Sequence, residues 1–159
     1  MSYSIYIGEM TEEREVDEDT GVPYLKVRVM AVTHPEAPTF PGDKMTGNSN
    51  SRHPGYSAWW NFLREAGLPC PPDDPRPFLV ETHPGTRILT KADLLLVEEA
   101  LARWKPTGPP GFKTDPRWDK DHDPTDANDY DGVLARLRWL KWWMTWALEN
   151  CERPAVYNR

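Results

Sequence analysis

The segment from about Tyr130 to Glu152 constrains the fold most, because its apolar residues recur at the spacing of an α-helix. One apolar stripe consists of Val133, Leu137, Leu140, Met144, Ala147 and Cys151, and a second consists of Trp139, Trp143 and Trp146. The opposite wedge carries Arg138, Lys141, Thr145 and Glu149. An apolar arc this wide predicts a helix buried against two neighbours, or against one neighbour and a partner chain, which allows a homo-oligomer through this Trp-rich helix. We expect Trp142, on the polar side, to stay partly exposed or to enter an interface.

Two further helices are predicted upstream. The first runs from about Gly55 to Ala66, and Gly67 is a natural stop. Its apolar positions at i, i+3, i+4 and i+7 are Tyr56, Trp59, Trp60 and Leu63. The second begins with Thr90 as N-cap and Asp93 three residues later, which is a capping-box pattern.

Strand-type alternation occurs in the first seven residues and again over Val22–Val32. These runs predict an antiparallel hairpin with Glu9–Gly21 as its long tip. The chain of 159 residues is therefore expected to form a single domain, 1–159, of α+β class. In this fold the N-terminal hairpin packs on the three helices, and an alternative adds a third short strand to the hairpin. Long Pro-rich loops are expected over Leu68–Pro77 and Lys105–Asn128.

The net charge of −6 lies in one segment. Residues Glu9–Thr20 hold seven acidic residues and one basic residue, and the remaining chain has 18 of each. A neutral body with one acidic loop has no general attraction for a polyanion, so duplex nucleic acid is not an expected partner. The acidic tip 9–20 is either a solvated turn or a docking surface for a protein.

The sequence also indicates a compartment. The N-terminus lacks the basic start and apolar run of a signal peptide, and no apolar run reaches membrane-spanning length. Cys70 and Cys151 are far apart and have no metal-type spacing. We therefore expect reduced thiols, no membrane association and a cytoplasmic protein.

A long polar loop from Thr39 to Trp60 is the main candidate for a functional site, because loops of this length in compact domains are uncommon and are usually functional or disordered. Within Asp43–Tyr56, a glycine and short polar side chains precede a helix start, where free N–H groups and the helix dipole favour an anion. We expect a small anionic, nucleotide-like ligand. The expected ligand-binding residues are Asp43, Thr46, Asn48, Asn50, Ser51, Arg52, His53, Tyr56, Trp59 and Arg87.

In this interpretation Arg52 and the loop amides hold the anion. Asn48 and Asn50 read polar edges of the ligand, and Tyr56 or Trp59 stacks on its ring. The alternative is a structural loop whose Asn and Ser side chains satisfy its own backbone.

Two other clusters were considered as sites. His83 and Arg87 lie in E-T-H-P-G-T-R, where they suit an acid–base group and an anion clamp, although a Pro-Gly turn explains the same residues. Four histidines without short ligand spacing argue against a zinc site. Asp119–Asp131 partly copies a calcium loop, but Pro124 replaces the required glycine, which favours a solvated loop whose last aspartates cap the following helix. No metal or cofactor is expected.

Most of the chain resembles a group of small proteins encoded by tailed bacteriophages. The resemblance is carried by D-K-M-T-G-N-S-N-S-R-H-P-G-Y-S-A-W, the later H-P-G, and R-L-R-W-L-K-W-W-M-T-W-A-L-E-N-C-E-R-P-A-V-Y-N. It implies a phage or prophage origin and action in the cytoplasm of a host cell, and it carries over no catalytic residue. Phage accessory proteins of this size often act by binding, for example by sequestering a signalling molecule.

Three functions are therefore considered. The first is a non-enzymatic protein that binds a small anionic ligand at loop 43–56. The second is an inhibitor of a host protein that acts through the acidic tip 9–20 or the Trp-rich helix. The third is a hydrolase that uses His53 and His83, although the sequence has no recognised pattern of nucleophile and base.

Overall fold

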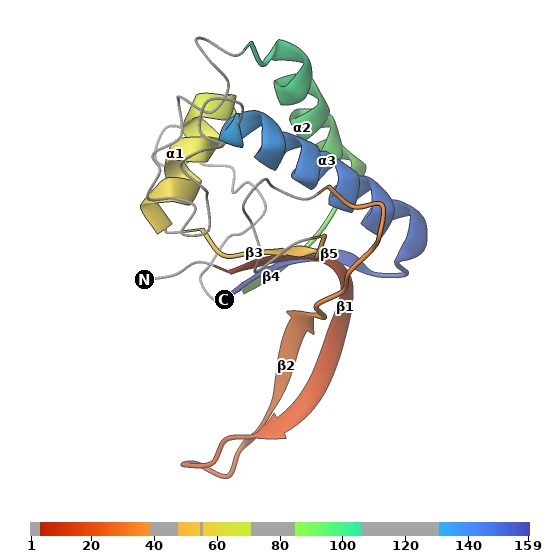
Figure 1. Cartoon of the computed structure of the whole chain (residues 1–159). Coiled ribbons are helices and arrows are strands. Elements are labelled where there is room, and N and C mark those ends of the chain that lie inside the picture. The colour runs from red at the N-terminus through yellow and green to blue at the C-terminus, as the bar shows by residue number, and fades with distance from the viewer. Residues whose placement is uncertain (1–3, 39–47, 55, 71–84, 106–130) are drawn as a thin grey trace.

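The computed structural model describes residues 4–38, 48–54, 56–70, 85–105 and 131–159, with Tyr56 and Ser57 described by their backbone alone. It has the expected α+β class, with one antiparallel sheet and three helices (Figure 1). The elements are β1 (Ile5–Val16), β2 (Pro23–Val29), β3 (Ser51–Arg52), α1 (Tyr56–Ala66), β4 (Gly85–Ile88), α2 (Lys91–Arg103), α3 (Gly132–Asn150) and β5 (Pro154–Asn158). None of the helices in these ranges is long and apolar enough to span a membrane.

The three predicted helices are confirmed, and so is the cap of the second. Thr90 and Asp93 form the expected capping box at the start of α2, in which each side chain bonds the backbone of the other residue. Asp131 caps α3 and accepts a hydrogen bond from the Leu134 amide at 2.9 Å. The last aspartate of the Asp119–Asp131 cluster therefore has the capping role that the sequence indicated.

The core lies between the helices and one face of the sheet. Helix α3 runs across this face in Figure 1, with α1 and α2 beside it. Most residues of the two predicted apolar stripes of α3 face inward, and the side chains of Trp139 and Trp143 are almost fully buried, whereas Trp146 and Cys151 are half-buried. Ile5, Ile7 and Val156 contribute the buried side of the sheet. Trp142 is half-buried, as its place on the helical wheel predicted.

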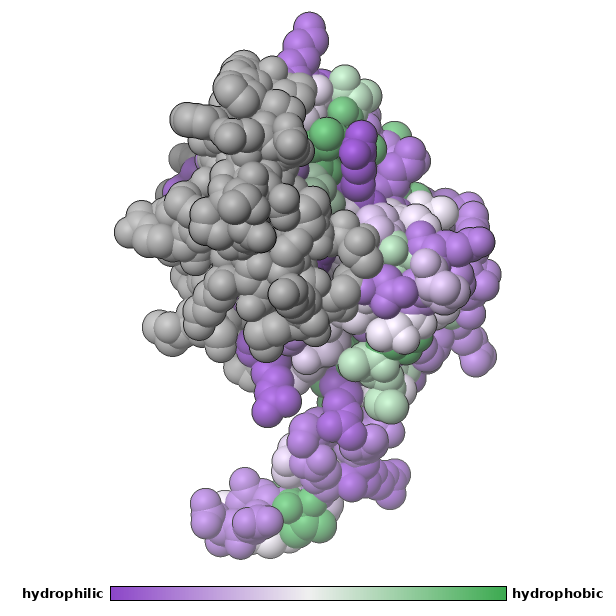
Figure 2. All heavy atoms as spheres, viewed as in Figure 1, coloured by the Kyte–Doolittle hydropathy of each residue, from purple (hydrophilic) through white to green (hydrophobic). Residues whose placement is uncertain are grey.

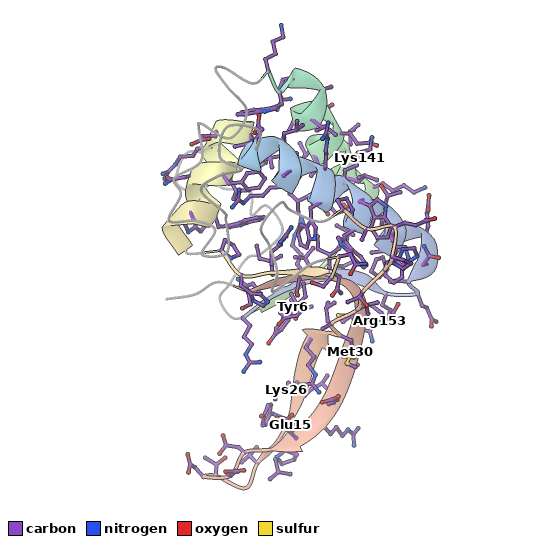
Figure 3. The ribbon with its side chains drawn as sticks, viewed as in Figure 1. Tyr6, Glu15, Lys26, Met30, Lys141 and Arg153 are labelled. Carbon is purple, nitrogen blue, oxygen red and sulfur yellow. The ribbon has the colours of Figure 1, made fainter. Side chains whose placement is uncertain are left out.

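The N-terminal hairpin is confirmed, but its expected tip is wrong. Strand β1 continues to Val16, so most of the acidic run lies in a strand, and the turn is only Asp17–Gly21. The acidic side chains suit a strand here because bases oppose them: Glu13 pairs with Arg28, and Glu15 pairs with Lys26. The distal parts of β1 and β2 project from the body as a two-stranded arm (Figures 1 and 3).

Strands β3, β4 and β5 were not identified from the sequence, which placed Ser51–Arg52 in a polar loop and Gly85–Ile88 at a turn. The sheet order is β2-β1-β5-β4, with β3 also paired to β1, so three strands extend the hairpin instead of one. Strand β5 lies between β1 and β4, and Ser4 and Arg159 exchange both backbone hydrogen bonds at 2.9 Å. The last residues described are therefore central to the sheet.

Candidate ligand-binding groove

The described part of the polar loop is tied to the protein's own backbone. The Asn50 amide nitrogen donates to the carbonyl oxygens of Ile7 and Met30 at 2.9 Å each, and its oxygen accepts from the Val32 amide at 2.8 Å. The side chain of Asn50 is fully buried. Asn50 thus joins β1 to the chain that follows β2, which fits the structural interpretation of this loop.

Arg52 is buried as well. It pairs with Ile5 in the sheet, and its guanidinium lies 5.7 Å from the ring centre of Trp139. The indole N–H of Trp139 donates to the Ser49 carbonyl at 3.0 Å, so this hydrogen bond attaches the loop to α3. Arg52 therefore packs inside the protein on an aromatic face.

His53 and Ser4 form a polar pair at the sheet edge. Their side chains are joined by a hydrogen bond of 2.8 Å at Nδ1, and the ring of Tyr6 lies edge-on to the imidazole at 6.0 Å. Burial, with a smaller contribution from the Arg52 charge, lowers the pKa of His53. The hydrolase hypothesis also needs His83, which lies outside the described residues.

The remaining predicted residues have separate surroundings. Trp59 is buried against Phe62 with ring centres 5.1 Å apart, and Arg87 forms an ion pair with the buried carboxylate of Asp93. Asp43 and Thr46 lie outside the described residues, and so does the side chain of Tyr56. The described candidates Asn48, Asn50, Ser51, Arg52 and His53 thus remain neighbours in one segment. Trp59 packs on Phe62 and Arg87 binds Asp93, so neither is shown to join them.

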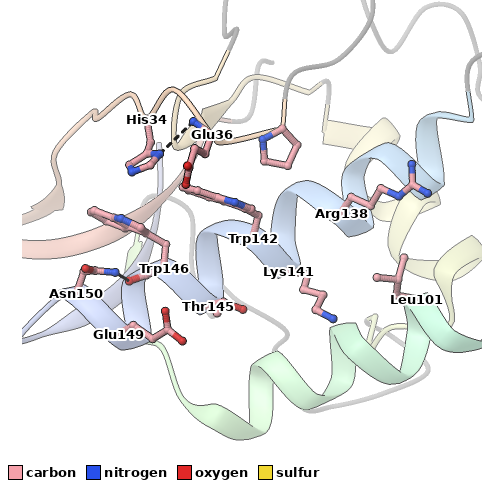
Figure 4. Close-up of a pocket in the computed structure, with 11 residues that line it drawn as sticks. His34, Glu36, Leu101, Arg138, Lys141, Trp142, Thr145, Trp146, Glu149 and Asn150 are labelled. Atoms are coloured by element: carbon pink, nitrogen blue, oxygen red, sulfur yellow. Dashed lines mark hydrogen bonds between the residues drawn. The ribbon is translucent and has the colours of Figure 1, made fainter.

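A groove lies on the outer face of α3. It has a volume of about 690 Å³, which is within the range of small-molecule sites (Figure 4). It is lined by His34, Glu36, Pro38, Leu101, Arg138, Lys141, Trp142, Thr145, Trp146, Glu149 and Asn150. Helix α3 forms its floor, and the segment 34–38 and α2 form its sides.

Aromatic rings occupy the middle of this groove. The ring centres of His34 and Trp142 are 5.0 Å apart. Trp142 and Trp146 each contact the fully buried Trp143 edge-on, at 4.7 and 5.3 Å. Because Trp143 is fixed in the core, the two groove tryptophans have a rigid support and need little ordering when a ligand binds.

The ends of the groove differ in charge. Arg138 and Lys141 lie toward the N-terminal half of α3, and Glu149 lies near its C-terminal end. Glu149 follows Arg138 by eleven positions along the helix, which corresponds to about 16 Å at a rise of ~1.5 Å per residue. Lys141 also makes a loose, exposed ion pair of 3.6 Å with Glu98 of α2. The basic end suits an anionic group, whereas Glu36 near the aromatic pair and Glu149 at the far end disfavour one.

The polar loop braces the wall of the groove. The His34 amide donates to the Asn48 carbonyl at 3.1 Å, and Thr33 forms an isolated bridge with Ser49. Within the wall, the Glu36 amide donates to Nδ1 of His34 at 3.2 Å. Residues 48–50 therefore hold the segment that carries His34, next to the place where the sequence analysis expected the ligand.

Sequence reasoning did not assign the groove, although part of its signal was visible. Arg138, Lys141, Thr145 and Glu149 were recognised as one polar wedge, and Trp142 as an aromatic residue on that side. His34 was missed because nothing local links it to α3. Only the fold brings this histidine against Trp142.

Metal ligands do not gather anywhere in the described ranges: no group of three or more His, Cys, Asp or Glu side chains is found there. Asp131 is occupied by its capping bond and by the indole N–H of Trp104 at 2.8 Å. Comparison with known proteins gave no match to a family model, to a curated protein or to a solved structure.

Proposed function

We propose that this protein acts by binding a small, planar, anionic ligand of nucleotide-like chemistry in the groove on α3. The observation that carries the proposal is the His34–Trp142 pair beside Arg138 and Lys141. The ring of the ligand stacks on the aromatic pair, and its anionic group lies at the two bases. The class of ligand is the one expected from the sequence, but the site moves from loop 43–56 to the groove.

Stacking supplies most of the affinity in this proposal. Stacking of a nucleic-acid base on an aromatic side chain contributes about 1–3 kcal/mol. Arg138 and Lys141 are exposed, so each contributes little as an isolated charge and serves mainly to orient the ligand. Glu149 disfavours a second anionic group at the far end, which favours ligands with one charged end over ligands charged at both ends.

Binding without catalysis fits the sequestering role that the resemblance to phage-encoded proteins suggests. In that role the protein lowers the free concentration of a host signalling molecule in the host cytoplasm. The described part of the polar loop then supports the groove wall through Asn48 and Ser49.

Isothermal titration calorimetry against a panel of nucleoside monophosphates, cyclic mononucleotides and cyclic dinucleotides tests the proposal. Nucleosides without phosphate and inorganic phosphate serve as the two partial ligands. We expect binding by a phosphorylated compound, and roughly threefold to tenfold weaker binding by the Arg138→Gln/Lys141→Gln variant. Arg64→Gln, an exposed change on α1, is the matched control.

Two results would contradict the proposal. The first is that no member of the panel releases heat. The second is a ligand that binds the Arg138→Gln/Lys141→Gln variant as tightly as it binds the wild type.

A further inference from the structure

The free end of the arm exposes apolar side chains that no described element covers. Val16 is 61% exposed and Leu25 is 52% exposed, and Pro23 between them is exposed as well. Figure 2 shows this as a hydrophobic patch among hydrophilic atoms at the end of the arm. Exposed aliphatic residues that cluster on a projecting strand pair form a candidate contact surface for another molecule.

The strand register places these residues on one face. Val16 is paired with Pro23, and Leu25 is paired with Arg14, and directly opposed residues share a face of an antiparallel pair. We call Val16, Pro23 and Leu25 the distal apolar face. Tyr24 points to the opposite face, where its hydroxyl donates to Glu15 at 2.6 Å.

The arm presents this face in a fixed conformation. The Asp17 carboxylate accepts hydrogen bonds from the amides of Asp19 and Thr20 at 3.1 and 2.7 Å, which closes the turn. On the opposite face, Glu15 binds Lys26 at 2.8 Å. The base of the arm is anchored where Thr86 of β4 donates to the Val27 carbonyl at 3.2 Å. A partner therefore meets a preformed surface, which lowers the entropic cost of binding.

The charge of this end selects the partner. Residues 14–25 contain Glu15, Asp17, Glu18 and Asp19 and one basic residue, Arg14, which lies opposite Leu25 on the same face, so this end has a net charge of −3. A second copy of the chain would bring the same net negative charge to the contact, and nucleic acids and anionic membranes would also be repelled. A surface that combines apolar side chains with lysine or arginine is complementary both to the apolar face and to the acidic turn.

We propose that the distal apolar face docks onto a basic amphipathic segment of a partner protein, with the acidic turn contacting lysine or arginine residues of that segment. This contact is independent of the groove. Within the acidic run, only the acids of the turn are proposed to contact the partner. Glu15, Glu13 and Glu12 of β1 are already paired with Lys26, Arg28 and Arg153.

A display library of random 16-residue peptides, selected on the immobilised full-length protein, tests this proposal. We expect enriched peptides that combine Lys or Arg with large aliphatic or aromatic residues. The variant Val16→Thr/Leu25→Thr should bind them at least tenfold more weakly, because threonine keeps the strand but removes apolar area. Tyr24→Thr, a change of the same kind on the opposite face, should change binding less than twofold.

A charge variant separates the two parts of the contact. Glu18→Gln/Asp19→Asn removes two charges and leaves the Asp17 carboxylate that closes the turn, and it should weaken binding and reduce its salt dependence. Peptides that bind the Val16→Thr/Leu25→Thr variant as well as the wild type would overturn the proposal. A selection that yields no binder, or a dimer seen by sedimentation in the wild type and lost in this variant, would also overturn it.

Discussion

The ring centre of His34 lies 5.0 Å from the ring centre of Trp142. His34 belongs to the segment that follows β2, which is far from α3 in the sequence. The segment is held by hydrogen bonds to residues 48–50 of the polar loop. Two features that look unrelated in the sequence therefore contribute to one groove: the polar helix wedge forms its floor, and the polar loop holds the segment that forms its wall.

Replacing Trp142 by alanine should separate binding from folding. Trp142 is half-buried and lines the groove, so its loss should remove ligand stacking and weaken binding at least tenfold, with a modest effect on stability. Trp143→Ala removes a fully buried ring and should destabilise the protein by about 3–5 kcal/mol. Titration calorimetry and urea unfolding of the two variants check the contrast. Full ligand affinity in Trp142→Ala would place the ligand elsewhere.

Asn50→Ala should destabilise the protein strongly, because it leaves the Ile7 and Met30 carbonyls and the Val32 amide without their side-chain partner. Each unsatisfied buried group costs about 1–3 kcal/mol, and we expect a total of roughly 3 kcal/mol because neighbouring groups and water replace part of the loss. The change in unfolding free energy in urea measures it. Asn61→Ala, at an exposed position of α1, is the control and should change stability by less than about 0.5 kcal/mol. Similar stabilities of the two variants would mean that Asn50 is not a structural residue.

Arg87→Gln distinguishes the two interpretations of this arginine. As an anion clamp it would reduce ligand binding, whereas its ion pair with the buried carboxylate of Asp93 predicts a loss of stability with binding intact. Breaking a buried pair from one side costs about 3–5 kcal/mol, and we expect the lower end because Arg87 is partly exposed. Thermal unfolding and titration at a temperature where the variant is folded give both readouts. Weakened binding with unchanged stability would support the clamp.

His53 should make the stability of the fold depend on pH. Burial and the Arg52 charge lower the pKa of His53 below the ordinary value of 6.5, so the folded protein binds this proton less tightly than the unfolded chain does. Its contribution is therefore fully present above about pH 6.5 and is lost as the pH falls toward the lower pKa of the folded state. Urea unfolding at pH 7.5 and pH 5.5 should show a larger loss of stability for wild type than for His53→Gln. Equal losses in the two proteins would exclude His53 as the source.

The helices and their caps could be predicted because their signals are local. The Thr90–Asp93 pair and the stripes of α3 depend on spacings within a few residues, and both were recovered. The extent of β1 was not, because an acidic run reads as a solvated turn until Lys26 and Arg28 are known to lie opposite. Strand β5 is five residues long, and only its pairing with β1 and β4 defines it.

The candidate site was harder to predict than the fold for a related reason. A sequence shows that Asn50 and Arg52 are polar, but it does not show whether a ligand or the protein itself satisfies them. In the structure the side-chain amide of Asn50 is hydrogen-bonded to backbone groups of the protein, and the guanidinium of Arg52 packs on the ring of Trp139. The groove could be predicted only in part. Its floor is the polar wedge of α3, which the sequence shows, but one side comes from residues 34–38, and only the fold brings that segment against α3.

The central place of β5 also determines when this protein can acquire its structure. Residues 5–9 pair with residues 154–158, so this part of the sheet closes only when both segments are available for pairing. Pairings of such long sequence separation slow folding and leave unpaired strand edges exposed meanwhile. Until that pairing forms, the acidic side chains of β1 discourage its association with strands of other chains.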